Sequence, residues 1–198
     1  LKPHIDHYSL SERLMLFDAA INVIRQAAQQ SKSDLHAFCN RAAIFLSEPD
    51  DGDLFRWAWR NCVAQVVAQV QEQPRPEPKY GDCLDMLPDC ETLISALAWA
   101  NDSEVMRSYA LQRAGNVLHS ELRLLPAEAC GLSAIDAAIE NLQYLAPKAR
   151  RQLALAGSTS IETDSKLNDT EALLMRGICS GLGYPPTTIL PGQPVKIG

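Results

Sequence analysis

A four-residue phrase that occurs twice constrains the fold of this chain more than any other feature. Asp18-Ala19-Ala20-Ile21 returns as Asp136-Ala137-Ala138-Ile139, a shift of 118 positions. Each copy lies in an apolar stripe at helical spacing, and each is followed by an acidic loop that opens another helix. Because internal repetition sets an architecture before any site is considered, the sequence predicts two related helical modules.

The whole chain follows the helical period. Leu14, Phe17 and Ile21 share one face of a first helix, which a capping box of Ser9 and Glu12 opens. No stretch alternates with period two over five or more residues between turn signals. We therefore expect an all-α protein, a bundle of about eight helices arranged as two pseudo-repeats.

Capping residues and prolines predict where the later helices begin and end. Gly181 and Gly183, followed by Pro185-Pro186, stop the last helix. The expected starts are Ser33 or Asp34, Asp53, Asp89, the Asn101–Glu104 box, Ser133, Pro147 in a first turn, and the Asn168–Glu171 box.

Prolines also divide the chain. Pro74, Pro76, Pro78 and Pro88 stand among polar residues and indicate an extended linker. The predicted organisation is a first helical module at 9–73, a Pro-rich linker at 74–88, a second module at 89–186 and a loose tail at 187–198.

Composition narrows the classes of partner. Apolar residues at 46% and charged residues at 21% are ordinary for a soluble domain of 198 residues. A net charge of −6 argues against nucleic acid. No apolar run approaches the roughly 18 residues that span a bilayer, so the chain is not expected to cross a membrane itself. The basic cluster Lys148-Ala149-Arg150-Arg151 is interpreted as a solvated helix face.

The six cysteines are too few for a disulfide scaffold. Cys39, Cys62 and Cys179 fall in apolar helical patterns, where a thiol behaves as a small hydrophobe. Cys83 and Cys90 are seven apart, which leaves open a disulfide or a zinc site, but free thiols are preferred. A reducing, cytoplasmic setting follows.

The histidines do not form a catalytic motif. His4, His7, His36 and His119 include no H-E-x-x-H pair. His36 and Cys39, three apart, could be a base and its nucleophile, but helix packing is the preferred interpretation. We expect no enzyme activity and no cofactor in this chain.

Acidic residues are the remaining candidates for a site. Asp50, Asp51 and Asp53 form one group, and Asp164, Asp169 and Glu171 form a second. Either group could supply oxygen ligands to Ca²⁺ or Mg²⁺. An EF-hand is excluded because Gly52 in its glycine position would put Ala58 at the bidentate one. Helix capping is preferred over metal for both groups. The residual metal candidates are Asp164, Asp169 and Glu171.

The last third of the chain resembles the tellurite-resistance TerB-like domains. The resemblance rests on Lys148, Asp164-x-x-Leu167, Glu171, Leu173-Leu174-Met175-Arg176 and Leu182-Gly183-Tyr184-Pro185-Pro186. Ser165 stands where those domains have glycine, which weakens any inference of a metal.

The succession from about Leu10 to Pro186 also resembles the cytoplasmic C-terminal region of large bacterial HtpX-like membrane zinc metallopeptidases. Arg56 stands where that region often has Glu. The matching segments are Leu16-Phe17-Asp18, Leu54-Phe55-Arg56-Trp57-Ala58, Leu124-Leu125-Pro126, Cys130-Gly131-Leu132 and Leu145-Ala146-Pro147-Lys148.

This resemblance implies a function and a location. The chain would be a non-catalytic accessory domain that recruits substrate, gates access or holds subunits together, on the cytoplasmic side and tethered to the inner membrane. Its partners would be the peptidase and membrane regions of its own polypeptide, or protein substrates. The catalytic zinc and membrane spans would lie upstream of Leu1. The alternative is a TerB-like module that binds or senses a divalent cation.

Overall fold

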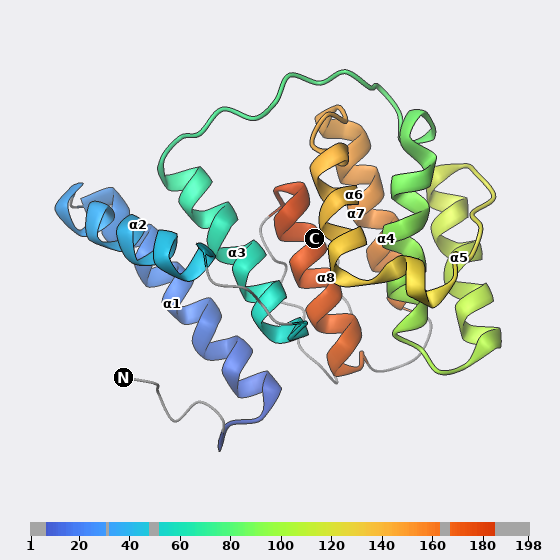
Figure 1. Ribbon diagram of the computed structural model, residues 1–198, viewed down its shortest axis with the longest axis horizontal. Helices are drawn as coiled ribbons and strands as arrows, with labels where there is room; N and C mark the ends of the chain where they lie inside the picture. Colours follow the sequence, from blue (N-terminus) through green and yellow to red (C-terminus); the bar gives the residue numbers. More distant parts are fainter. Residues whose placement is uncertain (1–6, 31, 48–51, 163–166, 185–198) are drawn as a thin grey trace.

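The computed structural model describes residues 7–30, 32–47, 52–162 and 167–184, and these form an all-α bundle (Figure 1). The all-α prediction, with about eight helices, is confirmed. The described helices are α1 (Leu10–Gln30), α2 (Lys32–Ser47), α3 (Leu54–Val70), α4 (Leu87–Trp99), α5 (Glu104–Leu118), α6 (Leu132–Leu142), α7 (Pro147–Ile161) and α8 (Asp169–Leu182), with 3-10 turns at Cys83–Met86 and Ala127–Cys130.

Several helices begin where their caps predicted. The Ser9 and Asn168 backbone N–H groups donate to Glu12 and Glu171 at 2.8 and 2.9 Å, which completes two capping boxes. Asp53 accepts the Arg56 backbone N–H at 3.0 Å and starts α3. These side chains satisfy N–H groups that a helix start otherwise leaves unpaired.

Other predicted starts were wrong by one to three residues. α2 begins at Lys32, before Ser33, and α4 begins at Leu87 rather than Asp89. Ser103 caps α5, because the Asn101 carboxamide accepts the Ser103 N–H instead of closing a box with Glu104. Gly131 precedes α6 without a side-chain cap, in place of Ser133.

A continuous apolar core crosses the linker. Leu14 of α1 and Trp57 of α3 belong to the same cluster as buried residues of α4 to α8. A smaller cluster, which includes Phe17, Ile21 and Val66, lies among the first three helices. The two chain segments are therefore packed together through α1 and α3.

Trp57 shows why one predicted helix face was incomplete. The helical spacing of Phe55, Trp59, Cys62 and Val66 in the sequence predicts that they share the buried face of α3, yet Trp57 is fully buried while Phe55 and Trp59 are only half-buried. α3 packs against α1 and α2 and also against α8, so it buries two faces. The indole fits because Gly177 opposes it: a Cβ at Gly177 would lie 2.2 Å from the ring.

The linker is held at both ends. It arches over the ends of α6 and α8 on its way to α4 (Figure 1). The Arg75 guanidinium donates to the carbonyls of Leu182 and Gly183 at 3.0 and 3.1 Å. At the far end the Ala146 N–H donates to the Tyr80 carbonyl at 2.8 Å. Gly183 ends α8 with a φ of 86°, which glycine adopts without strain.

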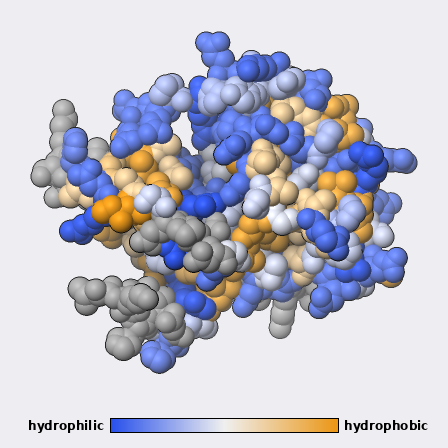
Figure 2. Space-filling model, viewed as in Figure 1, coloured by the Kyte–Doolittle hydropathy of each residue, from blue (hydrophilic) through white to orange (hydrophobic). Residues whose placement is uncertain are grey.

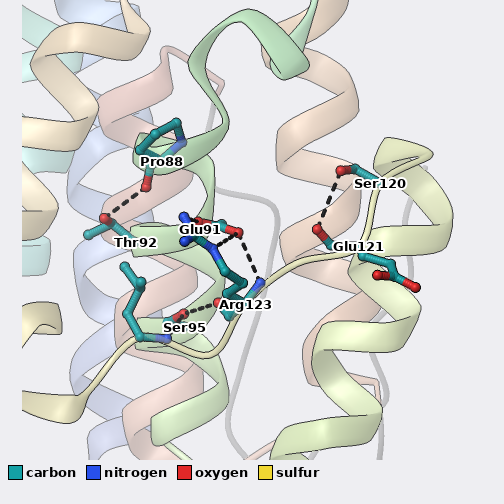
Figure 3. Close-up of polar contacts among 8 residues, drawn as sticks. Pro88, Glu91, Thr92, Ser95, Ser120, Glu121 and Arg123 are labelled. Atoms are coloured by element: carbon teal, nitrogen blue, oxygen red, sulfur yellow. Dashed lines mark hydrogen bonds and ion pairs between the residues drawn. The ribbon is translucent and has the colours of Figure 1, made fainter.

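The buried carboxylate of Glu91 in α4 binds the segment that follows α5. Glu91 is 1% exposed and accepts from the Arg123 backbone N–H at 3.0 Å and from its guanidinium at 2.9 Å (Figure 3). The Ser95 hydroxyl adds a bond to the Arg123 carbonyl at 3.3 Å. Burial alone raises the pKa of Glu91, but the bonds and charge of Arg123 outweigh it and lower that pKa.

Among the described helices, none combines the length and apolarity that crossing a membrane requires.

Candidate functional site

The predicted acidic candidates are separated or used as caps. Asp164 lies outside the described residues, and so do Asp50 and Asp51. Asp169 is exposed, whereas Glu171 is 2% exposed and accepts the Asn168 N–H. Within the described ranges, no three His, Cys, Asp or Glu side chains lie close enough to hold a metal ion.

The cysteines that were considered as candidates lie in surroundings typical of structural thiols. His36 is exposed on α2 and Cys39 is half-buried, and neither lines the pocket described below. Cys83 and Cys90 are free and fully buried, with the Cys83 thiol donating to the Ala149 carbonyl at 3.2 Å. The hydrogen bond of the Cys90 thiol to Cys83, together with burial, raises the pKa of Cys90, so the Cys90 thiol stays protonated.

The basic cluster does not form the fully solvated face that was expected. Arg150 is 6% exposed, and its Nε and one terminal nitrogen have no hydrogen-bond partner in the described part of the chain. Burial and the nearby charge of Arg75 lower the pKa of Arg150. The reason is position: Arg150 lies on the side of α7 that faces the protein interior, while Arg151 is exposed.

The repeated phrase places one aspartate of each module against an arginine of the other. Asp18 of α1 accepts from Arg176 of α8 at 2.5 and 3.3 Å. Asp136 of α6 accepts from Arg60 of α3 at 2.5 Å, and also from the indole N–H of Trp57 at 2.7 Å. The two contacts cross the linker in opposite senses, because Asp18 precedes the linker and pairs with an arginine after it, whereas Asp136 follows the linker and pairs with an arginine before it.

Helices α3 and α8 pack against each other, and we call the interface between them the seam. A pocket lies at one end of this interface. Cys62 and Ser180 face each other across the seam at 3.1 Å. The pocket has a volume of about 330 Å³, within the roughly 300–1,000 Å³ of typical ligand sites. Figure 2 shows a notch in the surface, with hydrophilic residues on one side of it and pale orange, more hydrophobic residues on the other.

The lining of this seam pocket is rich in carboxamides. It combines α3, the linker and the last turns of α6 and α8. Its described members are Asn61, Ala64, Gln65, Ala68, Gln69, Gln73, Pro74, Arg75, Pro76, Ile139, Gln143, Ser180, Gly181 and Gly183.

Gln65 is the exceptional member. It is 6% exposed, and neither its carboxamide oxygen nor its nitrogen has a hydrogen-bond partner among the described residues. Other polar groups of the lining are occupied: Asn61 donates to the Trp57 carbonyl at 3.1 Å and Gln143 donates to the Gly181 carbonyl. An unpaired buried amide costs about 1–3 kcal/mol, a cost that a hydrogen-bonding partner would recover.

This pocket was not predicted from the sequence, although the sequence contains a signal for it. Asn61, Gln65 and Gln69 recur every fourth residue along one side of α3, and Gln73 continues this spacing just beyond the end of the helix. No residue in this series carries charge or is a typical metal ligand, so the spacing alone did not indicate a site.

Comparisons with known proteins do not assign the chain to a family. No family model matches it, and no solved structure matches it significantly. A curated protein, Chromogranin-A of Struthio camelus, is 28% identical over 83 residues, which are 42% of this chain and 80% of that sequence. An identity this low over less than half of the chain leaves the function to be argued from the site.

Proposed function

We propose that this chain is a non-catalytic accessory helical domain that binds protein segments. Its binding would help a membrane-bound zinc metallopeptidase to recruit substrates or to gate access to its active site. The unpaired carboxamide of Gln65 in the seam pocket is the observation that carries the binding role. The metallopeptidase part rests on the sequence resemblance. In this proposal the domain lies on the cytoplasmic side, and its partners are other regions of its own polypeptide or protein substrates.

The absence of catalysis is part of the proposal. The 198 residues contain no H-E-x-x-H, the motif that places two imidazoles and a carboxylate around a catalytic zinc. Zinc would therefore be bound by a different part of such a peptidase.

Unfolded casein tests both halves of the proposal. We expect fluorescently labelled, reduced and carboxymethylated casein to bind saturably by anisotropy, at low salt and at 0.3 M salt, where surface charge is screened. We expect no casein fragments after incubation with Zn²⁺. Cleavage that survives repurification and stops with a chelator would contradict the non-catalytic role, and absence of binding would contradict the interaction role.

The parentage has a separate test. The coding sequence upstream of Leu1 should encode hydrophobic segments and an H-E-x-x-H motif. An upstream region without them would rule out the metallopeptidase part and leave the binding role to the casein result.

A further inference from the structure

We propose that the seam pocket binds one extended peptide segment of a protein partner, and that Gln65 pairs with the backbone N–H and C=O of a single residue in that segment. The inference rests on the proposed function and specifies its site and its ligand. It follows from three properties of the pocket: the unmet hydrogen bonding of one side chain, the charge of the lining and the size of the space.

The hydrogen bonding selects a peptide backbone. A primary carboxamide offers an acceptor oxygen and a donor nitrogen side by side. In an extended chain the N–H and C=O of one residue point to the same side, so they match both atoms of Gln65 together. Both atoms are buried and unpaired among the described residues, so the Gln65 side chain has to turn toward the pocket to reach a ligand, and the pairing would then recover a cost that the free protein carries.

The charge of the lining favours a neutral ligand. Arg75 is the one charged side chain among the described lining residues, and its guanidinium already donates to the carbonyls of Leu182 and Gly183. The described lining includes no carboxylate that would attract a cation. A neutral peptide backbone fits this balance better than an ion does.

The shape admits a chain but not a globular surface. Ala64 and Ala68 of α3 leave space beside Gln65, and Ile139 supplies an apolar wall. The absence of a side chain at Gly181 leaves room for Ile139, because a Cβ at Gly181 would lie 2.8 Å from the Ile139 side chain. A volume of about 330 Å³ suits a short stretch of chain with small side chains.

A capped peptide and its ester analogue test the pairing directly. N-acetyl-tetraalanine methylamide is titrated to millimolar concentration into the ¹⁵N-labelled full chain, and the Gln65 side-chain and Gly181 backbone signals are followed by NMR. We expect saturable shifts at both positions. Replacing one central peptide bond by an ester removes an N–H donor and should weaken binding about two- to tenfold, the size of one lost neutral hydrogen bond.

Two variants separate the carboxamide from the space. Gln65→Met keeps the length of the side chain and should weaken peptide binding about tenfold, with an unchanged or higher melting temperature. Ala68→Phe fills the pocket from a half-exposed position and should abolish binding while Gln65 is intact. Gln112→Met, the same substitution at an exposed position of α5, is the control and should leave binding unchanged.

The outcomes that overturn the inference are distinct from those that overturn the function. Unsaturable shifts in the native protein would mean that the pocket holds water only, and equal peptide binding by Gln65→Met would mean that Gln65 does not pair with the peptide; either result overturns the inference. If casein still binds the native chain in that case, the interaction role stands and its surface lies elsewhere. If neither casein nor peptide binds, both proposals are wrong.

Discussion

The two aspartate–arginine pairs join the same types of residue, and their aspartates stand at the same place in the two copies of the repeated phrase, but their surroundings differ. Arg176 is 1% exposed where it meets Asp18, whereas Arg60 is 27% exposed where it meets Asp136. Asp136 compensates with a second bond to the buried indole of Trp57.

This difference shows that two ion pairs with similar distances can contribute differently to the free energy of unfolding. Removing one partner of a buried ion pair leaves a charge without its partner in a medium of low dielectric constant, whereas water replaces a lost exposed partner. The pair with the buried arginine should therefore dominate the joining of the modules, although the two pairs have similar distances.

Asp18→Ala should have the largest effect. Arg176 would lose both carboxylate bonds, and we expect a loss of about 3 kcal/mol in the free energy of unfolding, measured by urea denaturation. The double variant Asp18→Ala, Arg176→Met should recover part of that loss, since it also removes the buried charge. A double variant less stable than Asp18→Ala alone would contradict the role assigned to burial.

Asp136→Ala should cost less, about 1–3 kcal/mol, and chiefly because the buried indole N–H of Trp57 loses its acceptor. Asp136→Asn keeps an acceptor for Trp57 and removes only the charge that faces Arg60. We expect it to cost about 0.2–1 kcal/mol, the value of an exposed pair. Equal losses in the two variants by urea denaturation would show that Arg60, rather than Trp57, carries the effect.

The comparison also shows how far the sequence could lead. The period of Leu14, Phe17 and Ile21 predicted a buried helix face because local spacing determines it, and Ser9, Asp53 and Asn168 marked helix starts because a cap acts within four residues.

Long-range packing could not be predicted in the same way. Trp57 is buried because α8 presents Gly177 to it, which no local pattern reveals. The pocket around Gln65 likewise requires α6 and α8 to meet α3, so its carboxamide series could be noticed in the sequence but not assigned to a site.

The caps of α3 and α8 can be compared in the same way, with smaller expected effects on the free energy of unfolding. Asn168 and Asp53 open corresponding helices, and each accepts a backbone N–H at 2.9 and 3.0 Å. Asn168→Ala and Asp53→Ala should each cost about 0.5–2 kcal/mol. Asn168→Ala should cost more, because its carboxamide also donates to the Ala100 carbonyl at 3.1 Å. Asn168→Asp keeps the cap alone and should fall between native protein and Asn168→Ala in melting curves.

Glu171→Gln should have the smallest effect and also tests the cation alternative. The Glu171 carboxylate accepts the Asn168 N–H at 2.9 Å, and the carbonyl oxygen of glutamine can accept it as well. We expect a smaller loss than for Asn168→Ala in the same melting experiment. Millimolar Ca²⁺ should leave both melting temperatures unchanged, because a cap needs no cation. A rise with Ca²⁺ that Glu171→Gln abolishes would instead show that this loop binds metal, since a ligand that binds only the folded state stabilises it by RT ln(1 + c/Kd), where c is the free ligand concentration.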